Sequence, residues 1–229
     1  MEYNKQVFKR LLSALLFICF IVGLYFRLSG LSSSVWSNVG YDETRDTLVA
    51  SHIALFNEHL IRGPHAANKY LSYPPTYYYF LSLLWQIVRG IYGLKLIWMM
   101  LSLGIIPIAY KLGEMVWDKR LGLLSAVLVA IHPVFILIGQ QVTPPYLLPL
   151  VVSLGVLCLL LRPIRAHTLA FAIGLLFLGL HIHYSTLLIT PVMFLWWIWT
   201  YQQYVRRCVT WKRWIPALVG IASFFHGCC

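Results

Sequence analysis

Three carboxylates, those of Asp42, Glu43 and Asp46, lie within five residues of a chain that is mostly apolar around them. A carboxylate within hydrogen-bond reach of an attacking hydroxyl or amine can accept its proton. If this segment is helical, Asp42 and Asp46 are four residues apart and share one face. The spacing therefore predicts a functional site. The plain alternative is that Asp42 and Glu43 begin a surface helix, where acidic side chains favour the helix dipole.

Composition places the chain among integral membrane proteins. Hydrophobic residues make up 60% and charged residues 11%, whereas about a quarter of residues are charged in soluble domains. The mean hydropathy is +0.75. Apolar runs of about 16 to 20 residues predict helices, because a β-barrel would show alternation. The net charge of +11 comes from short basic clusters between these runs, which indicates topology signals and argues against nucleic acid.

The apolar runs predict an all-α protein with about seven transmembrane helices in a single module, residues 1–229. The first run, residues 11–26, follows basic residues and ends at Arg27. No small-x-small cleavage site follows it, so a retained span with a cytoplasmic N-terminus is preferred over a cleaved signal sequence. The later runs are residues 94–112, 121–139, 146–161, 168–180, 186–200 and 214–225.

The longest polar connection, residues 27–75, holds four of the seven acidic residues and contains a loose helical pattern at residues 42–60. An interfacial helix is predicted at residues 76–89. Its helical part of about 13 residues would reach about 20 Å, less than a hydrocarbon core of about 30 Å. Three successive tyrosines there suit the headgroup zone better than sugar stacking.

The distribution of basic residues supports an outer-surface position for the tyrosine-rich segment. If the tyrosine-rich segment stays on the outer surface, twelve of the eighteen basic residues face the cytoplasm, as the positive-inside rule requires. The six left outside are Arg27, Arg45, Arg62, Lys69, Arg89 and Lys95. The outer face then brings together the long loop, the connection at residues 140–145 and the turn at residues 181–185.

The order of these features resembles the N-terminal portion of the GT-C membrane glycosyltransferases. The similar branch depends on polyprenyl-phosphate sugars and includes protein O-mannosyltransferases and the aminoarabinose transferase of lipid A. The resemblance rests on one N-terminal span, then DETR at residues 42–45, YPPTYYY at residues 73–79, KRLGLLSA at residues 119–126 and the following His132-Pro133. It extends to the small-residue stretch at residues 174–184 and so covers most of the chain.

The resemblance implies an enzyme of the plasma (inner) membrane that transfers a sugar from a polyprenyl-phosphate donor to an extracytoplasmic lipid, glycan or protein acceptor. It implies Asp42 as general base, with Glu43 beside it as a second candidate catalytic residue. A departing phosphate needs a cationic or hydrogen-bonding neighbour. The candidate substrate-binding residues, chosen largely by their side of the membrane, are Arg45, Asp46, Lys69, Tyr73, His181 and His183.

Several alternatives stay open at this stage. Asp46 could pair locally with Arg45, and the two histidines could be structural or solvated. No carboxylate occurs at residues 140–146, where many relatives have a second acid, so Gln140, Gln141 and Thr143 offer only neutral hydrogen bonds and argue against a divalent metal.

A non-enzymatic alternative also stays open. The chain is shorter than the family enzymes, which makes an inactive glycosyltransferase fragment one alternative. The other is a membrane scaffold or transporter-like protein whose outer loop binds a partner. Against a transporter, the apolar runs contain few ionisable groups, of which His132 is the clearest.

Overall fold

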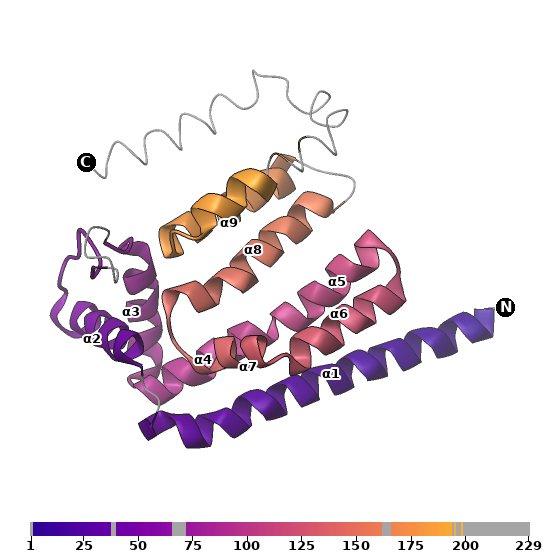
Figure 1. The fold of residues 1–229 in the computed structure, drawn as a ribbon, viewed down its shortest axis with the longest axis horizontal. Helices are drawn as coiled ribbons and strands as arrows, with labels where there is room; N and C mark the ends of the chain where they lie inside the picture. The colour runs from indigo at the N-terminus through magenta and orange to yellow at the C-terminus, as the bar shows by residue number, and fades with distance from the viewer. Residues whose placement is uncertain are drawn as a thin grey trace. The chain divides into compact units, whose positions relative to one another are not determined.

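The described part of the protein is entirely helical. The computed structural model describes residues 2–37, 40–65, 72–161 and 166–193, with Leu195 and Ile198, and contains no named strand there. The helices, labelled in Figure 1, are α1 (Glu2–Ser37), α2 (Tyr41–Phe56), α3 (Thr76–Val88), α4 (Ile91–Leu103), α5 (Ile105–Val116), α6 (Lys119–Ile131), α7 (Pro133–Gln140), α8 (Pro144–Leu160) and α9 (Ala166–Ile182). Residues Met1–Leu187 form one compact unit and Leu188–Cys229 a second. All contacts discussed below lie in the first.

Two helical stretches are long and apolar enough to cross a membrane, which supports the expected membrane association. They are Gln6–Ser29 within α1 and Ile91–Val116, which joins α4 and α5. The pair α6 and α7 counts as a third if one bent span is allowed. Helices α8 and α9 are apolar but have 17 residues each, fewer than the roughly 20 that a straight span needs. The expected run at residues 186–200 lies partly outside the described residues. The run at residues 214–225 lies wholly outside them.

The first helix differs from the sequence-based expectation. The apolar run ends at Arg27, but α1 continues through Arg27 to Ser37. Arg27 itself is 0% exposed and lies inside the apolar stretch Gln6–Ser29. It is therefore a buried cation near the end of a candidate span.

The buried guanidinium of Arg27 donates hydrogen bonds to four acceptors. Its Nε donates to the hydroxyl of Ser102 at 3.0 Å, and its two terminal nitrogens donate to the carbonyls of Gly23, Ala130 and Phe135 at 3.0, 3.4 and 3.1 Å. Gly139 makes room for the side chain, since a Cβ there would lie 3.0 Å from Cδ of Arg27. Arg27 thus connects α1 to α4, α6 and α7.

The bend between α6 and α7 explains why this cation is needed. The two helices meet at 56° around His132 and Pro133. Because proline has no N–H and disfavours helix at the preceding residue, the hydrogen-bond ladder breaks there. The N–H of Val134 bonds to Nδ1 of His132 at 3.2 Å instead of continuing the ladder to Ala130. The break leaves the carbonyl of Ala130 without a backbone donor. Arg27 donates a hydrogen bond to this carbonyl instead.

Two short helices carry the residues before the second span. Helix α2 ends at Phe56, and its C-cap Asn57 adopts the left-handed conformation with φ 53°. Helix α3 follows Pro74 and Pro75 and ends at Val88, and its C-cap Arg89 also adopts a positive φ. The helical part predicted at residues 76–88 is confirmed as α3; its position at a membrane surface stays a prediction.

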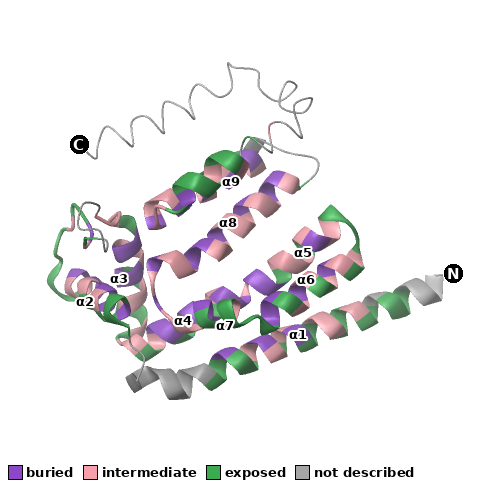
Figure 2. Ribbon diagram, in the orientation of Figure 1, coloured by how far each residue is buried: buried purple, intermediate pink, exposed green. Residues whose placement is uncertain are grey.

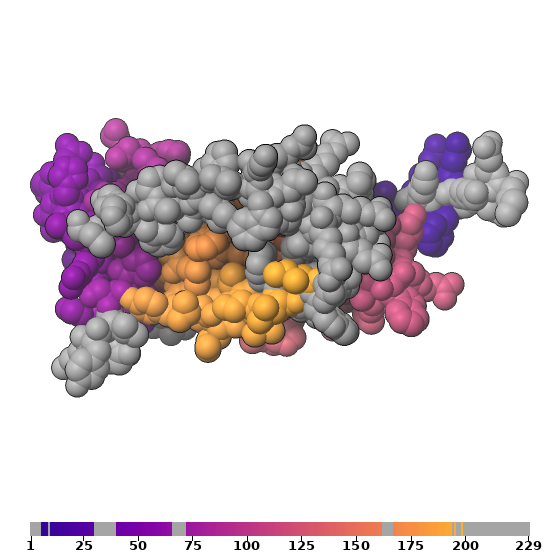
Figure 3. All heavy atoms as spheres, turned by 90° about the horizontal axis from the view of Figure 1, so that it is seen from above, coloured from indigo at the N-terminus to yellow at the C-terminus, as the bar shows by residue number. Residues whose placement is uncertain are grey.

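The apolar interior of the first unit forms two clusters. One joins α2, α3, α4 and α8 through residues such as Ala50, Tyr78, Trp98 and Leu148. The other joins α1 to α4, α5 and α6. Figure 2 shows buried residues along the inner sides of α2, α3 and α8. The segments around α2 and α3 lie beside one end of α9 (Figure 3), and this arrangement positions the polar residues described next.

Substituting Arg27 by Met tests its role at the bend. The carbonyls of Ala130 and Phe135 would lose a buried donor, so the free energy of unfolding should fall by roughly 2 kcal/mol. Thermal unfolding in detergent, followed by tryptophan fluorescence, measures the change. The matched control is Arg10→Met, since Arg10 is exposed on the same helix and should change little. Equal shifts for both variants would contradict the assigned role.

Candidate functional site

The first turn of α2 presents one exposed carboxylate beside one guanidinium. The side chain of Asp42 is 63% exposed, and its Oδ1 lies 2.9 Å from a terminal nitrogen of Arg45 one turn further along. Helix α2 begins at Tyr41 with Gly40 as its extended N-cap, and no side chain caps it. Asp42 is therefore free of a capping hydrogen bond, and its carboxylate is available at the protein surface.

Arg45 is anchored from the other side by Asp46. Its Nε and one terminal nitrogen both donate to Oδ1 of Asp46, at 2.9 and 2.8 Å. The hydroxyl of Tyr78 donates to the same oxygen at 3.1 Å. Asp42 and Asp46 thus share one guanidinium, as their spacing on one helix allows. Charge-assisted bonds of this kind fix the plane of the guanidinium as well as its position.

Burial dominates the electrostatics of Asp46. The side chain is 0% exposed, and desolvation raises the pKa of Asp46 to about 6, outweighing the opposing effects of Arg45 and Tyr78. Burial also raises the pKa of Tyr78 above its usual range, so its hydroxyl remains a donor. Asp46 is therefore an anchor inside the protein, whereas the sequence placed it among the substrate-binding candidates.

Glu43 points to a different partner in the interior. Its Oε2 lies 3.3 Å from Nζ of Lys95, and both side chains are 1% exposed. The two groups form an ion pair, but their geometry is not that of a hydrogen bond. Its Oε1 accepts the N–H of Val142 at 3.0 Å. Glu43 therefore ties α2 to α4 and to the connection between α7 and α8.

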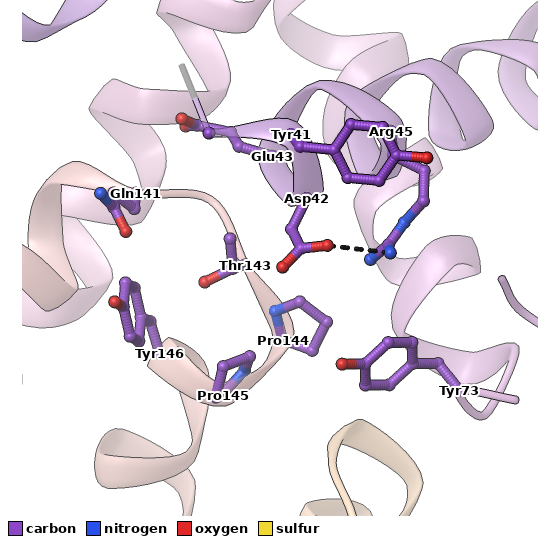
Figure 4. Close-up of a pocket in the computed structure, with 11 residues that line it drawn as sticks. Tyr41, Asp42, Glu43, Arg45, Tyr73, Gln141, Thr143, Pro144, Pro145 and Tyr146 are labelled. Carbon is purple, nitrogen blue, oxygen red and sulfur yellow. Dashed lines mark ion pairs between the residues drawn. The ribbon is translucent and has the colours of Figure 1, made fainter. Parts of the chain in front are cut away.

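A cavity of about 240 Å³ lies against the exposed face of this turn. Figure 4 shows the carboxylate of Asp42 between Arg45 and the connection that carries Thr143 and Pro144, with Tyr73 nearby. The lining residues are Gly40, Tyr41, Asp42, Glu43, Arg45, Tyr73, Gln141, Thr143, Pro144, Pro145 and Tyr146. The start of α2 and residues 140–145, which the predicted topology brings to one face, thus line the same cavity.

Tyr73 separates this cavity from a second one. The guanidinium carbon of Arg45 lies 5.6 Å from the centre of the Tyr73 ring, a distance typical of a cation–π contact. The ring of Tyr184 is nearly parallel to that of Tyr73, with centres 6.0 Å apart. The second cavity has a volume of about 300 Å³ and is lined by Ile61, Arg62, Ser72, Tyr73, Pro74, Pro75 and Tyr184.

The remaining predicted residues lie in different places. Lys69 is outside the described residues. His183 follows α9, with its ring centre 5.7 Å from that of Tyr73 and its Nδ1 2.6 Å from the hydroxyl of Ser185. Burial lowers the pKa of His183, so its imidazole is neutral near pH 7. His181 is half-buried in the last turn of α9, and neither histidine lines the two cavities.

The buried partner of Glu43 is a residue that the sequence pattern does not single out. The charge distribution predicts Lys95 among the external basic residues, but it is buried at the start of the span Ile91–Val116. A lysine inside an apolar run is itself a signal, because ionisable groups in such segments usually have a partner. The anchoring hydroxyl of Tyr78 carried no comparable signal within its row of tyrosines.

No group of three or more histidine, cysteine, aspartate or glutamate side chains is arranged to hold a metal ion within the part of the chain that the structure describes. The chain matches no known family model, no curated protein and no solved structure.

The titration of Asp46 should make the free energy of unfolding depend on pH. Because its pKa is raised from 3.8 to about 6, its ionised form destabilises the fold above about pH 6, and this penalty disappears as the pH falls through 6 towards 4. Asp46→Asn should therefore be more stable than wild type at pH 7, by up to about 3 kcal/mol, with the gap closing near pH 4. Thermal midpoints measured across this range give the difference, and a gap independent of pH would contradict this assignment.

The pair of Glu43 and Lys95 can be tested by a double-mutant cycle. Lys95→Met leaves a buried carboxylate without its cation and should cost roughly 3–5 kcal/mol. Adding Glu43→Gln removes the charge and keeps an acceptor for Val142, so the double variant should regain most of this loss. Thermal unfolding in detergent measures all four proteins. Additive losses would mean that the two side chains are not coupled.

Proposed function

We propose that the protein is a membrane glycosyltransferase that moves a sugar from a polyprenyl-phosphate donor to an extracytoplasmic acceptor. One observation carries this proposal: the exposed carboxylate of Asp42 and the anchored guanidinium of Arg45 line the same cavity, 2.9 Å apart. The pair combines a base with a cation for a leaving phosphate. The resemblance of the sequence motifs to the polyprenyl-phosphate-dependent GT-C enzymes supports the same reaction.

Asp42 acts as the general base. The acceptor oxygen or nitrogen attacks the anomeric carbon, and its proton passes to the carboxylate of Asp42. A new bond forms between acceptor and sugar while the bond between the anomeric carbon and the phosphate oxygen breaks, with inversion. The electron pair of that bond leaves on the polyprenyl phosphate. Glu43 does not take part in proton transfer, because its carboxylate is occupied by Lys95 and Val142.

Arg45 stabilises the leaving phosphate. A guanidinium suits a phosphate because its planar donors match two oxygens at once. In the structure Asp42 occupies one of these donor positions. A bound phosphate competes for that position and releases Asp42, which then faces the acceptor. Asp46 keeps Arg45 in place during this exchange through the two bonds on the opposite edge of the guanidinium.

The two cavities suggest how donor and acceptor are arranged. The donor phosphate occupies the cavity next to Asp42 and Arg45, and the acceptor approaches from the cavity beyond Tyr73. That second cavity offers the ring of Tyr184 and the exposed side chain of Arg62. Aromatic faces with a few polar groups are typical of ligand sites. His183, beside Tyr73, supplies a neutral hydrogen-bonding group near the boundary.

The site lies on the outer side of the plasma membrane, in a protein of about seven spans with a cytoplasmic N-terminus. Burial of Arg27 and Lys95 strengthens this orientation, because neither charge then faces the outer solution. Of the six basic residues assigned outside, four remain, against twelve on the cytoplasmic side. The greater imbalance agrees better with the positive-inside rule. The polyprenyl chain of the donor stays in the bilayer next to the cavity.

Asp42→Asn should reduce sugar transfer by a factor of about 10²–10⁴ without weakening donor binding, because it removes the base and leaves Arg45 in place. Transfer is measured in membranes containing the wild-type or variant protein, with radiolabelled polyprenyl-phosphate sugars as donors. The matched control is Glu58→Gln, which removes another exposed carboxylate from the same connection and should retain full activity.

Undiminished transfer by Asp42→Asn would remove the proposed mechanism. Absence of transfer by the wild type with every donor would instead favour a scaffold or an inactive glycosyltransferase.

A further inference from the structure

One buried oxygen beside the site has no role in the mechanism above. Oδ1 of Asp46 accepts three hydrogen bonds, but Oδ2 has no hydrogen-bond partner among the described residues although the side chain is 0% exposed. A buried, unpaired carboxylate oxygen costs free energy. A proton on this oxygen removes the larger part of the cost, that of burying a charge, because the carboxyl group is then neutral.

The charges around Asp46 make its proton important for an anion. From its own helix it faces Arg45 and, further away, Asp42; from α3 it faces the hydroxyls of Tyr77 and Tyr78; and from the segment before α3 it faces Tyr73. The tyrosines are neutral, because burial raises the pKa of each. Asp42, Arg45 and Asp46 therefore sum to a charge of −1 when both carboxylates are ionised.

The neighbouring charges do not change this sum. Glu43 and Lys95 form a pair with no net charge. An anion that approaches Arg45 thus meets a cation whose charge is more than cancelled by two carboxylates. Removing one of the two negative charges at a separation of several ångströms changes the binding of a single anionic charge by about tenfold or more.

We propose that Asp46 is a positioning residue that holds Arg45 in the cavity, and that a proton on Asp46 is what allows Arg45 to bind a phosphodiester anion tightly. The inference rests on the role of Arg45 in the proposed function. The proton comes from solvent and binds to Oδ2, while Oδ1 continues to accept from Arg45 and Tyr78. The charge of the cluster rises from −1 to 0, and anion binding is accompanied by proton uptake.

The pKa of about 6 for Asp46 supports this coupling, because proton uptake is then accessible near neutral pH. By linkage, a bound anion next to Arg45 favours the neutral carboxyl group and raises this pKa further. A donor with a phosphodiester linkage would therefore bind best on the acidic side of neutrality. The same donor would be released more readily as the pH rises.

The test uses farnesyl methyl phosphate, a phosphodiester that keeps a single negative charge across the range from about pH 5 to about pH 8. Its binding to the full-length protein in detergent is measured by isothermal titration calorimetry at several pH values. Wild type should bind about tenfold more tightly at the acidic end, with the change lying between about pH 6 and the higher pKa of the complex. Calorimetry in buffers of different ionisation enthalpy should show proton uptake.

Two substitutions distinguish the effect of the Asp46 charge from its role in positioning Arg45. Asp46→Asn keeps an acceptor for Arg45 and removes the charge, so it should bind tightly at every pH. Asp46→Leu removes the anchor and should bind weakly at every pH. Glu58→Gln is the control and should follow wild type. A pH profile that persists in Asp46→Asn would overturn the coupling, and equal affinities of the Asn and Leu variants would overturn the positioning role.

Failure of this inference is distinguishable from failure of the proposed function. Binding that follows the predicted pH profile without any sugar transfer supports the inference and counts against the glycosyltransferase. Transfer that depends on Asp42 together with binding that is flat with pH supports the glycosyltransferase and overturns the inference. Absence of binding by wild type across the pH range also overturns the inference.

Discussion

Two buried carboxylates hold the first turn of α2 in place, and the geometry of the candidate site depends on them. Glu43 binds Lys95 of α4 and the backbone of Val142, while Asp46 binds Arg45 and the hydroxyl of Tyr78. These contacts attach one short helix to α3, α4 and the connection before α8. Since Glu43 and Asp46 face the interior, Asp42 and Arg45 are left facing the cavity. Asp42 and Arg45 are thus positioned by the buried carboxylates of Glu43 and Asp46.

Charged groups in an apolar interior are tolerated only where partners offset the loss of hydration. The structure contains two solutions to this problem. Glu43 and Lys95 form an ion pair, whereas Arg27 has no acidic partner among the described residues and is satisfied by a hydroxyl and three carbonyls. Each of the two carboxylates has one oxygen without a hydrogen bond: Oε2 of Glu43 lies against Lys95, whereas Oδ2 of Asp46 has no hydrogen-bond partner among the described residues. This unpaired oxygen is the position at which the proposed proton binds.

The sequence allowed the local features to be predicted but not the contacts across the fold. The helix at residues 76–88 follows from the proline positions, and the four-residue spacing of Asp42 and Asp46 lets both contact Arg45, although Asp42 is exposed and Asp46 is buried. The burial of Arg27 and Lys95 could not be predicted, because their partners lie far away in the sequence: Arg27 bonds Phe135, 108 positions away. Glu43 likewise reaches Val142, 99 positions away. Charge alone suggested a membrane surface for both cations, whereas packing placed them inside.

The most direct test of the account is photo-crosslinking with a short polyprenyl phosphate that carries a diazirine beside its phosphate group. The account predicts crosslinks to the peptides containing residues 40–46 and 141–146, which line one cavity. Excess unlabelled polyprenyl phosphate should compete with this labelling, and Arg45→Gln should abolish it. Crosslinks confined to other segments, or labelling unaffected by Arg45→Gln, would contradict the central claim that this cavity binds a lipid-linked phosphate.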